Sequence, residues 1–202
     1  RIPSQHGVHD FISMPHDQQG KPRPGGPANS IQFLEGMACY PELLAELGYD
    51  TCLSGKWHLG DSREPRCGFK DWYPMPYGQC SYVDVPMVVD GEYPHIENTY
   101  ATDLFTDNAL KYLDDQVDKE TPFCLNVTYT APHKPWGREH HPAEIWDDYY
   151  NNCPFESTPG PDEPLAPGFQ RYDFLAPGDA AERQKTPDAE MRRQDLAGYF
   201  AS

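Results

Sequence analysis

Three side chains suited to acid–base and charge chemistry stand directly after two apolar, strand-like runs. Lys56 and His58 follow the run 49–54, and His133 follows the run 123–129. A lysine is a compact cation that can meet an anionic oxygen, and a histidine can donate or accept a proton near neutral pH. Together they suit hydrolysis of a sulfate or phosphate ester, in which the equatorial oxygens need charge neutralisation and the leaving alcohol needs an acid.

The runs that precede these residues alternate with helical patterns. Residues 40–48 have a proline at the second position, leucines on one face and a final glycine, which is typical of a short helix. Residues 98–116 carry an apolar stripe at helical spacing. Alternation of helix and strand predicts a mostly parallel sheet, where ligands bind outside the carboxyl ends of the strands. We therefore expect Lys56, His58 and His133 to converge at one edge of that sheet.

The rest of the chain divides by composition. With 202 residues, one folding unit, whole or partial, is expected. Residues 1–150 are interpreted as a sheet and helix core segment, with an Asp-Gly hairpin over residues 88–93. The proline- and glycine-rich stretch 151–188 predicts a long ordered loop. Residues 189–202 are interpreted as the start of a helix.

The charge balance bears on possible partners. The chain has 32 Asp+Glu against 16 Lys+Arg, a formal net charge of −16. Such a field repels phosphodiester backbones, so nucleic acid is not an expected partner. No run approaches the roughly 20 apolar residues of a membrane-spanning helix. Aromatic residues make up 13%, which indicates a chain that folds around a core. The oligomeric state stays open.

Six cysteines are present, at positions 39, 52, 67, 80, 124 and 153. They contain no C-x-x-C pair, so neither a zinc knuckle nor a thioredoxin-type site is expected. Their spacing is not diagnostic, and their disulfide state stays open.

Longer motifs add a resemblance to a family. Residues 43–51, running into Gly55-Lys56-Trp57-His58-Leu59-Gly60, resemble the second signature of the type I sulfatases, in the alkaline-phosphatase-like superfamily. Residues 1–8 resemble the segment just after that family's nucleophile motif, and Ala131-Pro132-His133 resembles a strand end that holds a catalytic histidine. The resemblance covers nearly the whole chain and is weakest over 151–188. It implies an α/β fold, an alkaline-phosphatase-like, mostly parallel sheet flanked by helices, incomplete in this chain.

The resemblance also implies a chemistry. Family members are sulfuric ester hydrolases whose nucleophile is a formylglycine, hydrated to a gem-diol beside a divalent cation, for which Ca²⁺ is expected. Residues 1–5 mimic the nucleophile motif superficially but fit the later segment better. We therefore expect the nucleophile upstream of residue 1 and the metal ligands outside these residues, with none in this chain. The 202 residues alone are expected to be inactive.

Site roles follow from the resemblance residue by residue. Lys56 would neutralise a sulfate oxygen, and His58 would hydrogen-bond the gem-diol and help to release sulfate. His133 would protonate or hydrogen-bond the leaving alcohol. The family has a polar residue, often serine, in the region of Gly78 and Gln79. Whether either residue makes the contact of that serine is left open.

Three further residues follow His133 and could shape a substrate pocket: Lys134, Trp136 and His141. Trp136 could stack on a sugar or aryl ring. The substrate is expected to be a small-molecule or glycan sulfate ester. The alternatives are a phosphonate or phosphodiester hydrolase of the same superfamily, and a non-catalytic paralogue that binds sulfated glycans. Export to a periplasmic, extracellular or lysosomal compartment is an expectation from the resemblance alone.

Overall fold

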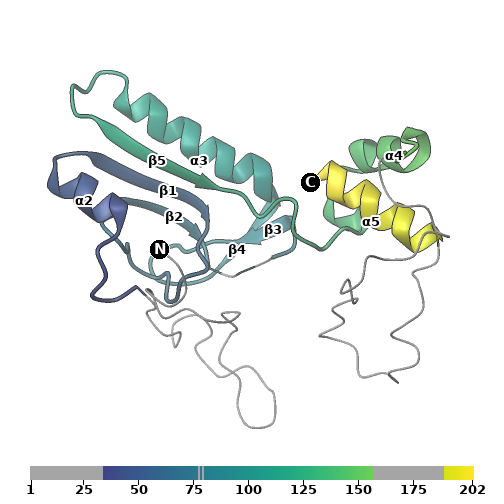
Figure 1. Cartoon of the computed structure of the whole chain (residues 1–202), viewed down its shortest axis with the longest axis horizontal. Helices are drawn as coiled ribbons and strands as arrows, with labels where there is room; N and C mark the ends of the chain where they lie inside the picture. The colour runs from purple at the N-terminus through teal and green to yellow at the C-terminus, as the bar shows by residue number, and fades with distance from the viewer. Residues whose placement is uncertain (1–33, 77, 79, 157–188) are drawn as a thin grey trace, which may run out of the picture. The chain divides into compact units, whose positions relative to one another are not determined.

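The computed structural model of the chain divides into two compact units, which are described separately (Figure 1). The first unit is Arg1–Pro135 and the second is Trp136–Ser202. The structure describes residues 34–76, 78, 80–156 and 189–202. Residues 1–8, Gln79 and nearly all of the loop expected over 151–188 therefore lie outside the described residues. The core segment expected over 1–150 extends past the boundary between the two units.

Three parallel strands form the sheet of the first unit: β1 (Asp50–Lys56), β2 (Asp71–Met75) and β5 (Phe123–Thr128). The order is β2-β1-β5, so β1 is central, and its residues 51–55 are buried. Cys52 pairs with Asp71 on one side and with Leu125 on the other. The parallel sheet predicted from the alternation of helix and strand is confirmed.

Two helices precede the strands as expected. Helix α2 (Tyr40–Glu46) leads into β1, with proline in its first turn, where a missing N–H costs nothing. Helix α3 (Ala101–Gln116) leads into β5 and lies along the sheet (Figure 1). The buried hydroxyl of Ser54 in β1 donates to the carbonyl oxygen of Phe105 in α3, at 2.8 Å. This bond fixes the helix on the central strand.

A second sheet consists of two antiparallel strands, β3 (Val83–Pro86) and β4 (His95–Tyr100). The hairpin expected over residues 88–93 is confirmed. Val89 and Glu92 form an antiparallel bridge around the Asp-Gly turn, and the N–H of each donates to the carbonyl oxygen of the other, at 3.1 and 2.9 Å. The pairing continues outward into β3 and β4.

The helix expected from residue 98 begins three residues later, because β4 continues to Tyr100. Strand β5, expected to be buried, is only half-buried. Phe123 is 43% exposed, and among the described residues no strand pairs with the far side of β5. An edge strand covered by a helix on one face keeps part of its surface open, which a run of apolar residues does not reveal.

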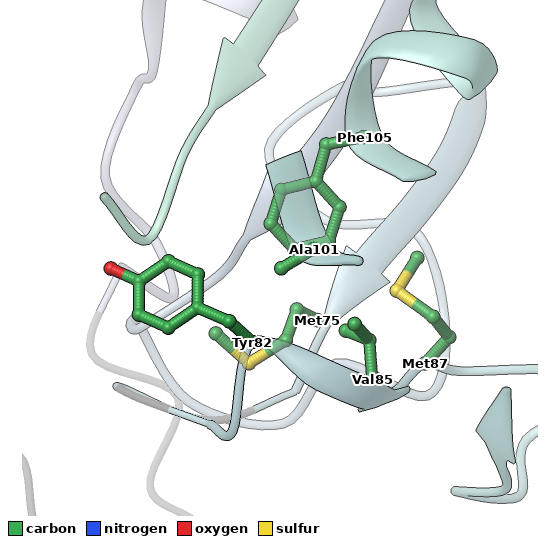
Figure 2. Close-up of a cluster of buried hydrophobic side chains, with 6 residues drawn as sticks. All are labelled: Met75, Tyr82, Val85, Met87, Ala101 and Phe105. Atoms are coloured by element: carbon green, nitrogen blue, oxygen red, sulfur yellow. The ribbon is translucent and has the colours of Figure 1, made fainter. Parts of the chain in front are cut away.

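The main core of the first unit lies where β2, β3 and α3 meet. Figure 2 shows the six buried side chains that form it, namely Met75, Tyr82, Val85, Met87, Ala101 and Phe105. Tyr82 and Phe105 are fully buried. The core therefore lies directly beside the segment that leaves the carboxyl end of β2.

The second unit contains helix η2 (Arg138–His140), helix α4 (Ala143–Asn152) and helix α5 (Ala189–Ala201). Helix α5 covers the residues expected to begin a helix, whereas α4 was not predicted. Trp146 of α4 is buried with Ala197 and Ala201 of α5. Small residues on α5 thus receive the indole ring of α4.

Candidate functional site

The carboxyl ends of β1 and β5 are tied together at the point where the candidate residues begin. Gly55 has φ +112°, and a Cβ on it would lie 2.2 Å from the carbonyl oxygen of Thr128. Only glycine allows this backbone conformation and this close approach. The hydroxyl of Thr128 donates to the carbonyl oxygen of Lys56, at 2.8 Å. The last residue of β1 is therefore held against the last residue of β5.

Lys56 ends β1 as a half-buried cation. Burial lowers the pKa of its ammonium group, and the neighbouring Cys80 opposes that effect. Among the described residues, no carboxylate forms an ion pair with Lys56. An amine held in a partly desolvated position without a counter-charge favours an anionic ligand.

Cys80 is the titratable neighbour of Lys56. Burial raises the pKa of its thiol to about 11, while the Thr130 hydroxyl and the Lys56 ammonium act in the opposite direction. Cys80 is thus a neutral thiol near pH 7, and it does not cancel the charge of Lys56. Thr130 is itself buried, and it lies between Thr128 and His133 in the sequence.

His58 lies two residues beyond Lys56, on the other side of a buried tryptophan. Trp57 is 6% exposed, and its backbone N–H donates to the carbonyl oxygen of Met75, at 3.1 Å. Its ring packs edge-on against Trp72 and Phe69. Since alternate residues of an extended chain point to opposite faces, anchoring Trp57 inward turns Lys56 and His58 to the other face.

Gly78 lies against the ring of His58. A Cβ on Gly78 would be 2.3 Å from Cε1 and 2.4 Å from Nε2 of His58, closer than any side chain can approach. The serine that the family often has in this region is therefore absent at position 78, and Gln79 lies outside the described residues. The imidazole here meets bare backbone instead of a hydroxyl.

His133 is held at both ends of its backbone. Its N–H donates to the carbonyl oxygen of Thr130, at 2.9 Å, and its carbonyl oxygen accepts a hydrogen bond from the hydroxyl of Tyr82, at 2.6 Å. In the ring, Nδ1 lies 2.8 Å from the carbonyl oxygen of Lys134. A carbonyl only accepts, so Nδ1 carries the hydrogen, and Nε2 is left to meet a ligand.

These contacts place three chain segments at the same edge of the sheet. Gly78 lies against His58 and Tyr82 bonds to His133. The thiol of Cys80 lies close enough to Lys56 for each to affect the pKa of the other. The pairing of β1 with β5 confirms that the two strand ends lie side by side. That Lys56, His58 and His133 act on one ligand stays a prediction.

The three expected pocket residues are divided between the two units. Lys134 is exposed at the end of the first unit. Trp136 and His141 belong to the second unit. The Trp136 ring packs edge-on against Tyr199 of α5, at 6.3 Å between centroids, and His141 is 5% exposed. Their substrate-binding roles stay predictions.

Sequence reasoning missed Cys80, Tyr82 and Thr130. Cys80 and Tyr82 lie in an irregular segment after β2. The hydrogen-bond partner of Tyr82, His133, is 51 residues away in the sequence. No periodicity or motif signals such contacts. Thr130 lies two residues beyond the end of β5, where polar residues are candidates for a site, but a hydroxyl alone points to no chemistry.

A metal centre finds no support in the described part of the chain. Residues 34–76, 78, 80–156 and 189–202 contain no group of three or more His, Cys, Asp or Glu side chains placed to hold a metal ion. The expected Ca²⁺ therefore has no ligand set here, and its binding outside these residues stays a prediction. In the same residues, no helix is both long and apolar enough to span a membrane.

The sequence of the chain matches a known protein family. The family described as Sulfatase matches residues 11–195. The chain belongs to the sulfatase family. The match includes every candidate residue from Lys56 to His141, and it confirms the resemblance carried by the segment Gly55–Gly60.

Individual sulfatases are similar over a little more than half of the chain. An N-acetylglucosamine-6-O-sulfatase from Bacteroides thetaiotaomicron is 35% identical over 135 residues, covering 60% of this chain and 23% of that protein. An N-acetylgalactosamine-6-sulfatase from Mus musculus is 30% identical over 131 residues, covering 55% of this chain and 24% of that protein. The chain spans about a quarter of the length of these curated relatives.

Solved structures agree on the fold. A complex of a protein with its substrate D-glucosamine-2-N,6-O-disulfate has a TM-score of 0.54 and 28% identity, covering 80% of this chain and 27% of that chain. A structure from work on glycosaminoglycan metabolism by Bacteroides thetaiotaomicron has a TM-score of 0.59 and covers 96% of this chain and 41% of that chain. At 19% identity, the second likeness concerns the fold alone. The α/β, alkaline-phosphatase-like architecture, incomplete in this sulfatase chain, is confirmed.

Proposed function

We propose that the protein to which this chain belongs hydrolyses sulfate monoesters. The observation that carries the proposal is the environment of Lys56. Its ammonium group is partly buried at the carboxyl edge of a parallel sheet, beside the neutral thiol of Cys80 and without an ion pair among the described residues. A fixed cation of this kind is suited to an anion that keeps its charge at every physiological pH.

The two histidines supply the remaining chemistry of this chain. Because Nδ1–H of His133 donates to the carbonyl oxygen of Lys134, Nε2 faces the ligand, and it can donate a proton to the leaving alcohol when the ring is in its imidazolium form. His58, on the same face as Lys56, would hydrogen-bond the attacking group. Two imidazoles at one edge of a sheet can thus serve opposite sides of a tetrahedral sulfate.

Two components of the reaction are proposed outside the described residues. A formylglycine would act as the nucleophile, and a divalent cation, expected to be Ca²⁺, would supply further charge neutralisation. The described residues contain no group of three or more His, Cys, Asp or Glu side chains placed to hold a metal ion, and the roles of Lys56, His58 and His133 are assigned without it.

The substrate class is proposed from the relatives. Those named above act on sulfated hexosamines, and another, 32% identical over 120 residues, is an ulvan-active sulfatase from Formosa agariphila. We propose a glycan or sugar sulfate ester as the substrate, with Lys134 as a candidate contact in the first unit.

The proposal is tested on the full-length, matured protein. Turnover of an aryl sulfate should exceed turnover of the matching aryl phosphate, phosphonate and phosphodiester. Lys56→Ala should abolish most of that activity, and Lys111→Ala, which removes an exposed lysine from α3, should not. Preference for a phosphate or phosphonate ester would transfer the protein to another branch of the superfamily. Binding of a sulfated sugar without turnover would indicate the non-catalytic alternative.

A further inference from the structure

Two cysteines that have no part in the proposed chemistry meet at the amino-terminal end of α2. The sulfur of Cys39, the residue just before α2, lies 3.2 Å from the sulfur of Cys67, which precedes β2. Both side chains are partly buried. No other pair of cysteines makes a sulfur–sulfur hydrogen bond in the described part of the chain. We infer that Cys39 and Cys67 form a disulfide in the oxidised protein.

The two segments are held together by contacts that do not involve sulfur. A Cβ on Gly68 would lie 2.3 Å from Cα of Glu42, so the backbone after Cys67 rests directly on the first turn of α2. The N–H of Cys39 donates to the carboxylate of the same Glu42, at 3.4 Å. Glu42 thus positions both cysteines.

The Cys67 side is also fixed to the central strand. The hydroxyl of Thr51 in β1 donates to the carbonyl oxygen of Gly68, at 2.6 Å, and accepts from the N–H of Lys70, at 3.1 Å. Two cysteines can be bridged without backbone movement only when their segments already lie at bonding distance. Because independent hydrogen bonds anchor both segments, the bridge requires a small approach of two sulfur atoms and no rearrangement.

The chemistry needs a disulfide oxidant, such as glutathione disulfide or a disulfide oxidoreductase. In the first step, Cys39 loses its proton and acts as the nucleophile. Its thiolate attacks one sulfur of the oxidant and releases one reduced thiol. The thiolate of Cys67 then attacks the mixed disulfide at Cys39, forms the new S–S bond and releases the second thiol. The two cysteine hydrogens end on the reduced oxidant.

The bridge would enclose the segment that carries the candidate site. Helix α2, β1, Lys56 and His58 all lie between the two cysteines in sequence. Cys67 also packs against the cluster of Leu53, Trp57 and Phe69, and Trp57 is the anchor between Lys56 and His58. A cross-link here restricts the unfolded chain and fastens the anchor of the two candidate residues.

Peptide mapping of the full-length protein tests the inference directly. The protein is equilibrated with glutathione disulfide, alkylated under denaturing conditions without reduction, and digested with trypsin and a glutamate-specific protease. The sequence then places Cys39 alone in the peptide 36–42 and Cys67 alone in the peptide 67–70, with Cys52 in a separate peptide. The expected result is one linked species of these two peptides that loses two hydrogen atoms relative to their sum and separates on reduction.

Two variants complete the design. Cys153→Ser, in the second unit, should retain the linked species, and Cys39→Ser should leave Cys67 alkylated. Oxidation should also raise the thermal unfolding midpoint of the wild-type protein and leave that of Cys39→Ser unchanged. Alkylation of both Cys39 and Cys67 in the oxidised wild-type protein, or linkage of Cys67 to a different cysteine, would overturn the inference. Neither result depends on the proposed sulfatase activity.

Discussion

The backbone of Gly78 lies so close to the imidazole of His58 that a Cβ there would overlap Cε1 and Nε2, at 2.3 and 2.4 Å. The ring is part of the proposed site and cannot give way without leaving its position. Any larger residue at 78 must therefore displace His58 or the backbone that follows β2.

Gly78→Ala should reduce kcat/KM of the full-length enzyme by about 100-fold, the scale expected when a reacting group is misplaced by about 1 Å. The matched control is Gly137→Ala, where the added Cβ meets only the mobile carboxylate of Glu139. Its rate and thermal unfolding midpoint should stay close to wild type. Equal kinetics for Gly78→Ala and wild type would remove the proposed contact from the site.

Lys56→Ala should raise the barrier for sulfate ester hydrolysis by at least ~2.7 kcal/mol, or about 100-fold in kcat/KM, by analogy with loss of one oxyanion donor. The physical reason is removal of a partly buried cation that has no counter-charge among the described residues. Steady-state kinetics with Lys111→Ala as the control checks the effect. A rate within a factor of two or so of wild type would show that Lys56 does not touch the transferring group.

The pH dependence of the same step follows from the lowered pKa of Lys56. Since the folded environment favours the neutral amine, the cation should be lost at a lower pH than for an exposed lysine, and activity should decline on the alkaline side accordingly. In Lys56→Arg, the guanidinium stays protonated, and the alkaline decline should move to higher pH or vanish. A pH–rate profile of kcat/KM for both proteins measures this shift. Identical alkaline limbs would assign the decline to another group.

His133→Ala should slow substrates with poor leaving groups more than activated aryl sulfates, because only the former need a proton from Nε2. Comparison of an alkyl or sugar sulfate with a nitrophenyl sulfate measures the difference. Equal losses for both substrates would argue against protonation of the leaving group and leave His133 with a binding role.

Two buried tyrosines form a matched pair for stability. The hydroxyl of Tyr82 donates to the carbonyl oxygen of His133, whereas that of Tyr112 is buried without a hydrogen-bond partner among the described residues. Tyr82→Phe should destabilise the fold by about 1 kcal/mol, and Tyr112→Phe should be neutral or stabilising. Thermal unfolding midpoints check both, and Tyr82→Phe should also lower kcat. The opposite order of stabilities would contradict the assigned hydrogen bond.

Acid stability should depend on Asp61, which follows the segment Gly55–Gly60. Burial alone would raise the pKa of its carboxyl group, but hydrogen bonds and charge from Arg63, with Arg66 nearby, lower it overall. A carboxylate with a lowered folded-state pKa stabilises the fold above its unfolded value of about 3.9, and the stabilisation disappears as the pH falls through the folded-state pKa.

The unfolding midpoint of Asp61→Asn should therefore lie below that of wild type near neutral pH, and the two should converge in acid. Asp107→Asn, an exposed change on α3, serves as the control and should follow wild type throughout. A difference that persists undiminished below the folded-state pKa would assign the effect to packing instead of charge.

The elements with strong local signals could be predicted from the sequence. The proline and glycine at the two ends of α2, the apolar stripe of α3 and the apolar run of β5 are local signals. The position of Lys56 and His58 at the carboxyl end of a strand could also be predicted locally, although β1 extends two residues further than expected and includes Lys56. The parallel pairing of β1 and β5 followed from the order of helix and strand. Local rules could find these features because local interactions produce them.

Other features depend on contacts between distant segments. The exposure of β5 depends on which strand occupies the sheet edge. The fit of Gly78 against His58 and the bond from Tyr82 to His133 need the folded chain. Helix α4, with its stacked Trp146 and Tyr150, was missed because polar and hydrophobic residues are equal in number over 143–152, and the helix packs against α5, a segment distant in the sequence.

The hydrogen bond from Tyr82 to His133 should constrain the sequence evolution of this core. One phenol ring fills the interior and also holds the proposed proton donor in place, so the interior is not free to drift as long as the chemistry is maintained. Met75 and Phe105 pack in the same cluster as Tyr82. A substitution at either residue that changes side-chain volume should therefore affect catalytic turnover as well as folding stability. Natural variation in this cluster is expected to be narrower than its distance from the substrate would suggest.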